Sequence, residues 1–129
     1  MKFLVVPLCS ISFLSCSLLE PTAINHFKVK QGTPVEQVFV CTESTINHLK
    51  SNKGTWDDAV TTRDIQRGIF ETGKFKHVNI MGIRMLLTYN PVRGDGYIKV
   101  KASGPYFSDL GASEAVLNLR NGIVGCLKH

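Results

Sequence analysis

The chain has 129 residues and a formal net charge of +5, because 15 lysine and arginine residues outnumber 10 acidic ones. This length allows one compact domain after removal of a leader and excludes two domains of ordinary size. The basic residues are scattered along the chain, so the charge permits contact with nucleic acid or another acidic surface without requiring it.

The first residues have the layout of a secretory signal peptide. A lysine at position 2 precedes an apolar run that no acidic residue interrupts. Small residues suited to a cleavage site stand at Ser15, Ser17 and Ala23. The pattern predicts a removable leader over residues 1–23, with cleavage somewhere between Ser15 and Ala23, export from the cell, and a mature domain over residues 24–129.

A second interpretation of the leader is a lipid anchor. Residues 13–16, FLSC, loosely resemble a bacterial lipobox, in which Cys16 would become a lipidated N-terminus. This alternative predicts a bacterial lipoprotein with a binding role. No later segment is apolar enough to form a membrane span.

The cysteines indicate a covalent crosslink. Cys9 and Cys16 lie in or beside the leader, whereas Cys41 and Cys126 belong to the mature domain. Because the export route is an oxidising environment, Cys41 and Cys126 are predicted to form one disulfide. By chain entropy this disulfide stabilises the fold by on the order of 4 kcal/mol. Two free buried thiols are the alternative.

The first part of the mature domain predicts little regular structure. Residues 24–34 are polar, with a glycine and a proline, and predict an irregular arm. Residues 35–41, VEQVFVC, alternate apolar and polar side chains and predict a strand. Residues 42–58 are compatible with a short helix or a hairpin.

One helix is predicted over residues 61–73. Thr61 or Thr62 can cap its amide groups, Asp64 favours the positive end of the helix dipole, and Gly73 supplies a C-terminal stop. The predicted buried stripe of this helix consists of Ile65, Ile69 and Phe70.

Three apolar segments follow this helix. They are HVNIMGIRMLLTYN, GYIKVKAS and EAVLNLRNGIVGCLKH, and the turn-rich sequences PVRGDG and SGPYFSDLGAS separate them. Several strands that follow one helix, with no further helix between them, predict a small single α+β domain. One main helix would pack on a central antiparallel sheet.

The residues able to carry chemistry are few. The imidazoles are His26, His48, His77 and His129, and no two of them have the spacing of a metal-ligand motif. No G-x-S-x-G nucleophile elbow occurs. The sequence therefore predicts no metal and no cofactor, and general acid–base chemistry by a histidine and a carboxylate is the remaining route.

Several motifs resemble the fungal guanyl-specific extracellular ribonucleases. Residues 114–129 resemble the closing hairpin of that family, in which a glycine and three residues precede the catalytic histidine, here Gly125 and His129. Residues 75–85, FKHVNIMGIRM, place His77 at the position of the first active-site histidine. Residues 62–65 resemble the start of the family's single helix.

The departures from the family imply a pseudo-ribonuclease, not an enzyme. The catalytic glutamate of the family is replaced by Ile98 or Lys99, and its arginine by Glu114 or Ala115. Met81 occupies the position at which that family has a glutamate that hydrogen-bonds the guanine base. Without a base and an anion clamp the transphosphorylation is lost, so the two histidines are vestigial. An active ribonuclease or toxin that uses His77 with Glu71 or Asp95 is the alternative.

The overall layout resembles the ribonuclease-like effectors of powdery mildew fungi. The shared features are a leader, the aromatic-x-Cys motif at Phe39–Cys41, a second cysteine near the end, and an emptied active site. The resemblance implies secretion, delivery into the cytoplasm of a plant cell, and a virulence or avirulence role without membrane attachment. The implied partner is a host plant protein, including an intracellular leucine-rich-repeat immune receptor, or RNA bound weakly.

Two groups of residues are candidates for partner contact. Lys99 and Lys101 alternate on one predicted strand, so both should point to the same sheet face and hold phosphates there. A solvated basic face is the alternative. The other candidates are aromatic or arginine residues of the kind that anchor interfaces, with core packing as the alternative for the aromatic ones: Trp56, Tyr89, Arg93 and Tyr106.

Overall fold

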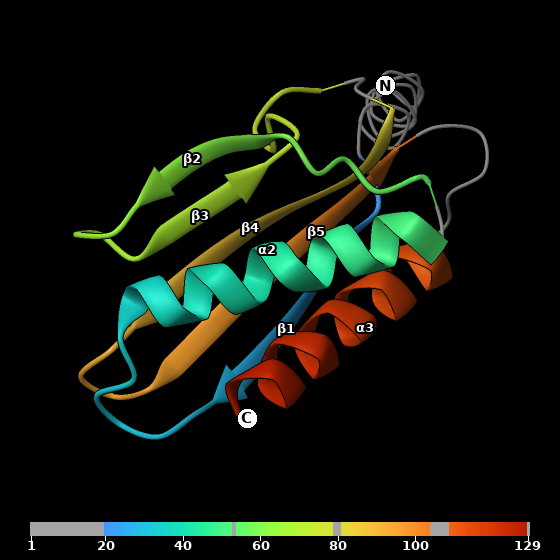
Figure 1. The fold of residues 1–129 in the computed structure, drawn as a ribbon. Coiled ribbons are helices and arrows are strands. Elements are labelled where there is room, and N and C mark those ends of the chain that lie inside the picture. The colour runs from blue at the N-terminus through green and yellow to red at the C-terminus, as the bar shows by residue number, and fades with distance from the viewer. Residues whose placement is uncertain (1–19, 53, 79–80, 104–108, 129) are drawn as a thin grey trace, which may run out of the picture.

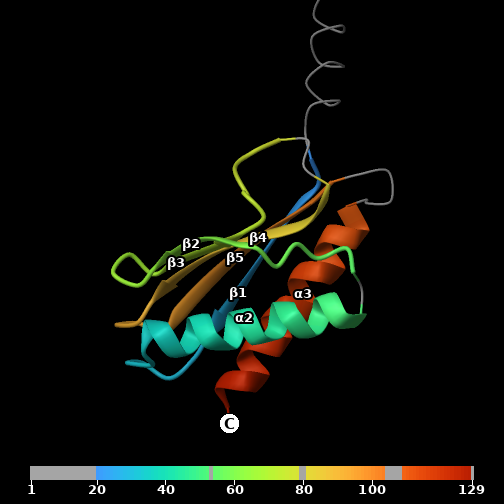
Figure 2. The same cartoon turned by 45° about the horizontal axis from the view of Figure 1, so that its top comes forward.

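The computed structural model describes residues 20–52, 54–78, 81–103 and 109–128. Five antiparallel strands form one sheet in the order β1-β5-β4-β3-β2. Two helices lie side by side on one face of this sheet (Figures 1 and 2). In chain order the elements are β1 Thr22–Lys28, α2 Val35–Asn52, β2 Val60–Asp64, β3 Ile69–Thr72, β4 Gly82–Asn90, β5 Asp95–Ser103 and α3 Asp109–Leu127.

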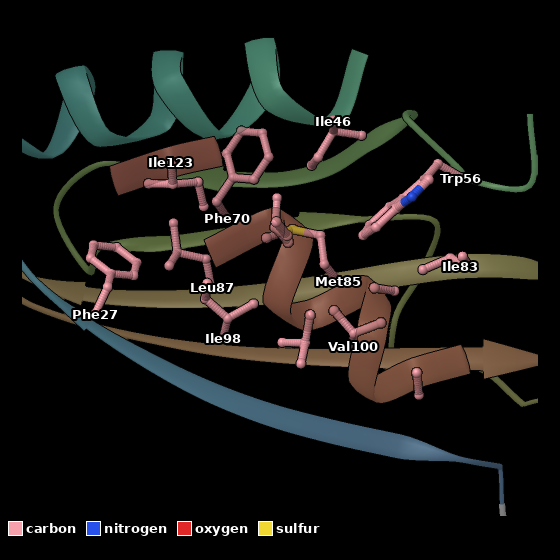
Figure 3. Close-up of a cluster of buried hydrophobic side chains, with 14 of the residues drawn as sticks. Phe27, Ile46, Trp56, Phe70, Ile83, Met85, Leu87, Ile98, Val100 and Ile123 are labelled. Atoms are coloured by element: carbon pink, nitrogen blue, oxygen red, sulfur yellow. The ribbon is translucent and has the colours of Figure 1, made fainter. Parts of the chain in front are cut away.

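The core lies between the sheet and the two helices (Figure 3). Alternate residues of the central strands point toward the helices and are buried, as the two-residue period of a strand requires. Phe39 of α2 packs on Phe70 of β3 with ring centroids 5.2 Å apart. The sheet contributes Phe27, Phe70, Ile83, Met85, Leu87, Tyr89, Ile98, Val100 and Ala102 to this layer.

The predicted strand over residues 35–41 is wrong, because this segment opens helix α2. The buried stripe of this helix runs from Val38 to Ile46 at helical spacing, but two threonines within it disguise the apolar pattern. Thr42 and Thr45 are buried, and their hydroxyls donate to the carbonyls of Val38 and Cys41 at 2.7 Å. A hydroxyl satisfied within its own helix can face the core, so both threonines act as apolar residues here.

The predicted helix over residues 61–73 is also wrong, because the segment forms the β2–β3 hairpin. Asp64 accepts a hydrogen bond from the Arg67 amide at 3.1 Å and thereby starts a tight turn. Gly68 ends the turn with φ of 69°, and a Cβ there would collide with the Tyr89 carbonyl oxygen. Asp64, expected near the start of a helix, is therefore a turn residue, while Thr61 and Thr62 lie in β2 and Gly73 follows β3 with φ of 67°.

The predicted closing hairpin over residues 114–129 is wrong as well, because helix α3 spans most of this segment. Asn121 and Gly122 suggested a hairpin turn, but Gly122 lies within the helix where α3 crosses α2. A Cβ at Gly122 would collide with the Thr45 side chain, so glycine permits this close helix contact. Beside it, the predicted disulfide Cys41–Cys126 is confirmed, with Cα atoms 5.6 Å apart.

The predicted irregular arm over residues 24–34 is wrong in its first half, because strand β1 pairs with β5 along the edge of the sheet. The strand begins at Thr22, and the amide of Ala102 donates to the Pro21 carbonyl at 3.1 Å. Residues 20–23, which the predicted leader included, are thus in contact with the sheet.

The fold class is confirmed: a small single α+β domain with helices on one face of an antiparallel sheet and one disulfide. Strands β4 and β5 and the turn between them also lie where predicted. There are two main helices, not one, and the disulfide joins helix to helix, not strand to strand. Residues 62–65 and 114–127 adopt other structures than the ribonuclease resemblance implies for them.

Candidate functional site: the uncovered face of the sheet

The side of the sheet opposite α2 and α3 is its open face, which no described helix covers (Figure 2). Its side chains are those that alternate with the buried core residues along each strand. The pairing register places them in rows across the sheet. The open face consists of Thr22, Ile24, His26, Lys28, Thr62, Asp64, Ile69, Glu71, Arg84, Leu86, Thr88, Asn90, Asp95, Tyr97, Lys99 and Lys101.

The middle of the open face holds a mixed apolar, aromatic and cationic group, which we name the central patch: Ile24, His26, Leu86, Tyr97 and Lys99. Lys99 lies between Ile24 and Leu86 in the register. The rings of His26 and Tyr97 meet edge to face with centroids 4.8 Å apart. The Lys99 ammonium lies 5.8 Å from the Tyr97 ring centroid, within range of a cation–π contact.

Lys101 lies on the same face as Lys99, as their alternation predicts, but its ammonium is already engaged. It donates to the Phe75 carbonyl at 3.0 Å and lies 4.6 Å from the Phe75 ring centroid. These contacts hold the side chain toward residues 74–78, a turn-rich segment at one end of the open face. Lys99 is therefore the lysine of the predicted pair that is better placed to meet a partner.

Arg84, which sequence reasoning missed, is the charged group of the open face with the greatest burial. Its side chain is 0 % exposed, yet it carries a full positive charge at neutral pH. The guanidinium forms an ion pair with Glu20 at 2.8 Å and donates to the His77 carbonyl at 2.6 Å. The charge is therefore matched within the fold, and the ion pair ties Glu20, which the predicted leader included, to strand β4.

Glu71, on β3, is a second buried charged residue of this face. Its carboxylate accepts hydrogen bonds from the Thr61 and Thr62 hydroxyls at 2.9 and 2.8 Å. A small hollow brings Glu71 together with the exposed His77, and the hollow is also lined by Lys74 and Lys76. The fold thus places a carboxylate and an imidazole near each other, six positions apart in the chain, with Glu71 on β3 and His77 in the turn-rich segment that follows it.

The far end of the open face is a wider, shallow groove beside the β2–β3 turn. The lysine and arginine residues along it are Lys28, Arg67, Arg93 and Arg120. Asp95 reduces this charge, because its carboxylate lies 3.5 Å from the Lys28 ammonium and 3.4 Å from the Arg93 guanidinium. The groove therefore keeps a moderate positive charge and borders the central patch at His26 and Tyr97.

The residues predicted to contact a partner differ in their exposure. Trp56 and Tyr89 are buried in the core, so the core alternative holds for both. The Tyr89 hydroxyl donates to the Thr33 carbonyl at 2.8 Å, and burial raises the pKa of this phenol. Arg93 is exposed in the β4–β5 turn, as its role requires. Tyr106 and His129 lie outside the described residues.

His26 and Ile24 were missed because they were assigned to an irregular arm. The signal that could have found them is the alternation of residues 22–28, in which Ala23, Asn25 and Phe27 form one face and Thr22, Ile24 and His26 the other.

Comparison with known proteins supplies no relative: no protein-family model and no curated protein sequence matches the chain. Within the described ranges, no three histidine, cysteine, aspartate or glutamate side chains are grouped to hold a metal ion. No described helix is long and apolar enough to cross a membrane.

Proposed function

We propose that the protein is an exported effector that acts by binding a protein of a host plant cell through the central patch, without catalysis. The observation that carries the proposal is the composition of this patch, in which Lys99 is framed by Ile24 and Leu86 and borders two aromatic rings. Protein interfaces are enriched in aromatic residues that combine apolar surface with a polar tip.

The effector assignment rests on the leader, the confirmed disulfide and the sheet with helices on one face. It does not rest on the predicted closing hairpin, because that segment is helical. The proposed route is secretion by a powdery mildew-like fungus and delivery into the plant cytoplasm. An intracellular leucine-rich-repeat immune receptor is the proposed type of partner.

A protein partner fits the central patch better than RNA does. Two of the basic side chains that would meet phosphates, Arg84 and Lys101, donate to groups of the same chain. One ring surface of Tyr97 lies under the Lys99 ammonium, which reduces the area on which a base would stack. Weak RNA binding at Lys99 is the variant, and it requires a steep loss of affinity as salt rises.

The test is capture of partners from plant tissue with wild-type protein and two charge reversals. Lys99→Glu should abolish capture of the specific partner, whereas Lys30→Glu, an exposed lysine outside the central patch, should leave it unchanged. The complex must then re-form from purified components with the same ranking of variants. Equal binding by both variants would contradict the proposal.

The second candidate function is an active ribonuclease, favoured by the hollow that Glu71 shares with His77. Glu71 would act as the base and His77 as the acid, the two roles that hydrolysis of RNA through a cyclic phosphate needs. Purified wild-type protein would then cleave RNA in a gel assay, and Glu71→Gln or His77→Ala would stop it. Intact RNA after incubation with the wild type excludes this function.

A further inference from the structure

We infer that the mature protein begins at or before Glu20, with the leader cleaved between Ser17 and Leu18 and not after Ala23. The inference rests on the proposed export and on the structural role of Glu20. It locates the processing site to one peptide bond, and it moves the start of the mature chain to the N-terminal side of strand β1.

The first step is the burial of Arg84. Its side chain is 0 % exposed, and that of Glu20 is 12 % exposed. A carboxylate 2.8 Å from a buried guanidinium compensates a charge that water does not reach. Removing one member of such a pair leaves the other charge buried without that compensation, which strongly destabilises a fold.

The second step is the backbone around Glu20. The Thr22 hydroxyl donates to the Glu20 carbonyl at 3.1 Å, and the next carbonyl, of Pro21, accepts the amide of Ala102 on β5. Thr22 and Ala23 themselves pair with Lys101 and Val100. Cleavage after Ala23 would therefore remove both the carboxylate partner of Arg84 and the first two residues of strand β1.

The third step is the sequence at the two possible cleavage sites. Signal peptidases select small residues at the first and third positions before the scissile bond. Cleavage after Ser17 meets this requirement with Ser15 and Ser17, whereas cleavage after Ala23 places Pro21 at the third position. The sequence and the Glu20–Arg84 contact thus favour the same boundary.

Two recombinant chains, 18–129 and 24–129, test the structural part. We expect chain 24–129 to melt roughly 10 °C or more below chain 18–129, or not to fold. In chain 18–129, Glu20→Gln should reproduce a large part of this loss. Glu114→Gln, an exposed glutamate of α3, should change the melting temperature by less than about 4 °C.

Arg84→Met separates the lost ion pair from the shortened strand. If Glu20 acts through Arg84, this substitution should at least halve the difference in melting temperature between the two chains. An undiminished difference, or equal melting of chains 18–129 and 24–129, overturns the inference.

The processing site itself is read from the intact mass of the protein secreted by a yeast that expresses the complete chain. A species that begins at Leu18 is expected. A start at position 19 or 20 overturns the assignment of the cleaved bond, and a main species beginning after Glu20 overturns the structural boundary as well. Failure of secretion would contradict the proposed export, whereas the melting comparison still decides the structural boundary.

Discussion

Single side chains in this protein often satisfy their polar groups inside the core. Thr42 and Thr45 bond to their own helix, and the Tyr89 hydroxyl bonds to the Thr33 carbonyl. Burying each of these hydroxyl groups costs free energy, and its hydrogen bond offsets that cost. Sequence reasoning made Tyr89 a candidate contact residue with core packing as the alternative, and its inward place on β4 decides for the core.

The buried Tyr89 phenol should make stability sensitive to alkaline pH. Burial raises its folded-state pKa, so its contribution is fully present below the unfolded pKa of about 10 and is lost as pH rises through the folded value. Tyr89→Phe should cost about 1 kcal/mol at pH 7 because it removes the bond to Thr33.

Denaturant titrations of wild type and Tyr89→Phe at several pH values check this expectation. The free energies of unfolding of the two proteins should converge as the pH rises above about 10, because only the wild type carries this titrating phenol. Every other tyrosine is common to both chains. A constant difference over that range would show that Tyr89 ionises equally in both states.

At the scale of elements, the packing of α3 against α2 depends on close contacts that local sequence signals did not reveal. The helical spacing of Ala112, Ala115, Val116, Leu119 and Ile123 was present in the sequence. The Asn121–Gly122 pair outweighed it in the prediction because such pairs are strong hairpin signals. The reason for glycine at 122 is Thr45, which is 77 positions away and invisible to local reasoning.

Two glycines of α3 offer a matched pair of substitutions. Gly122→Ala should destabilise the protein by about 1–3 kcal/mol, because the added methyl group meets the Thr45 side chain. Gly125→Ala meets no neighbouring atom and should stabilise the helix by up to about 1 kcal/mol. Thermal denaturation of both variants checks the opposite signs, and a gain at both positions would contradict the described helix contact.

At the scale of the whole molecule, one covalent bond connects the helix layer. Cys41 and Cys126 are 85 positions apart, so the disulfide restricts most of the unfolded chain. Neither cysteine lies in a strand, so the crosslink joins the two helices directly and not the sheet. The disulfide therefore holds α3 against α2 and leaves the open face on the other side of the molecule.

Replacing both cysteines with serine should lower the free energy of unfolding by up to about 4.5 kcal/mol, the value that chain entropy assigns to a loop of this length. Equilibrium unfolding of the oxidised wild type, the reduced wild type and the double variant provides the measurement. The reduced and doubly substituted chains should agree closely. Undiminished stability of the reduced and the doubly substituted chains would show that the disulfide does not restrict the conformations of the unfolded chain.

The sequence alone determined the class of the fold, the pairing of the two mature cysteines, and the strands β4 and β5 with their turn. Local alternation and turn residues encode strands that are buried on one side, and two cysteines that follow a predicted leader indicate that they pair with each other. Residues 35–41, 61–73 and 114–129 were assigned to the wrong element because their local signals are shared by helices and strands, and residues 24–28 of β1 were assigned to an irregular arm.

Only the tertiary structure decided which face of the sheet is uncovered and which residues meet there. The central patch draws on β1, β4 and β5, and the contact of Glu20 with Arg84 joins positions 64 residues apart. Such contacts depend on the pairing register between strands, which sets the direction of every side chain and leaves no mark in the sequence of a single strand.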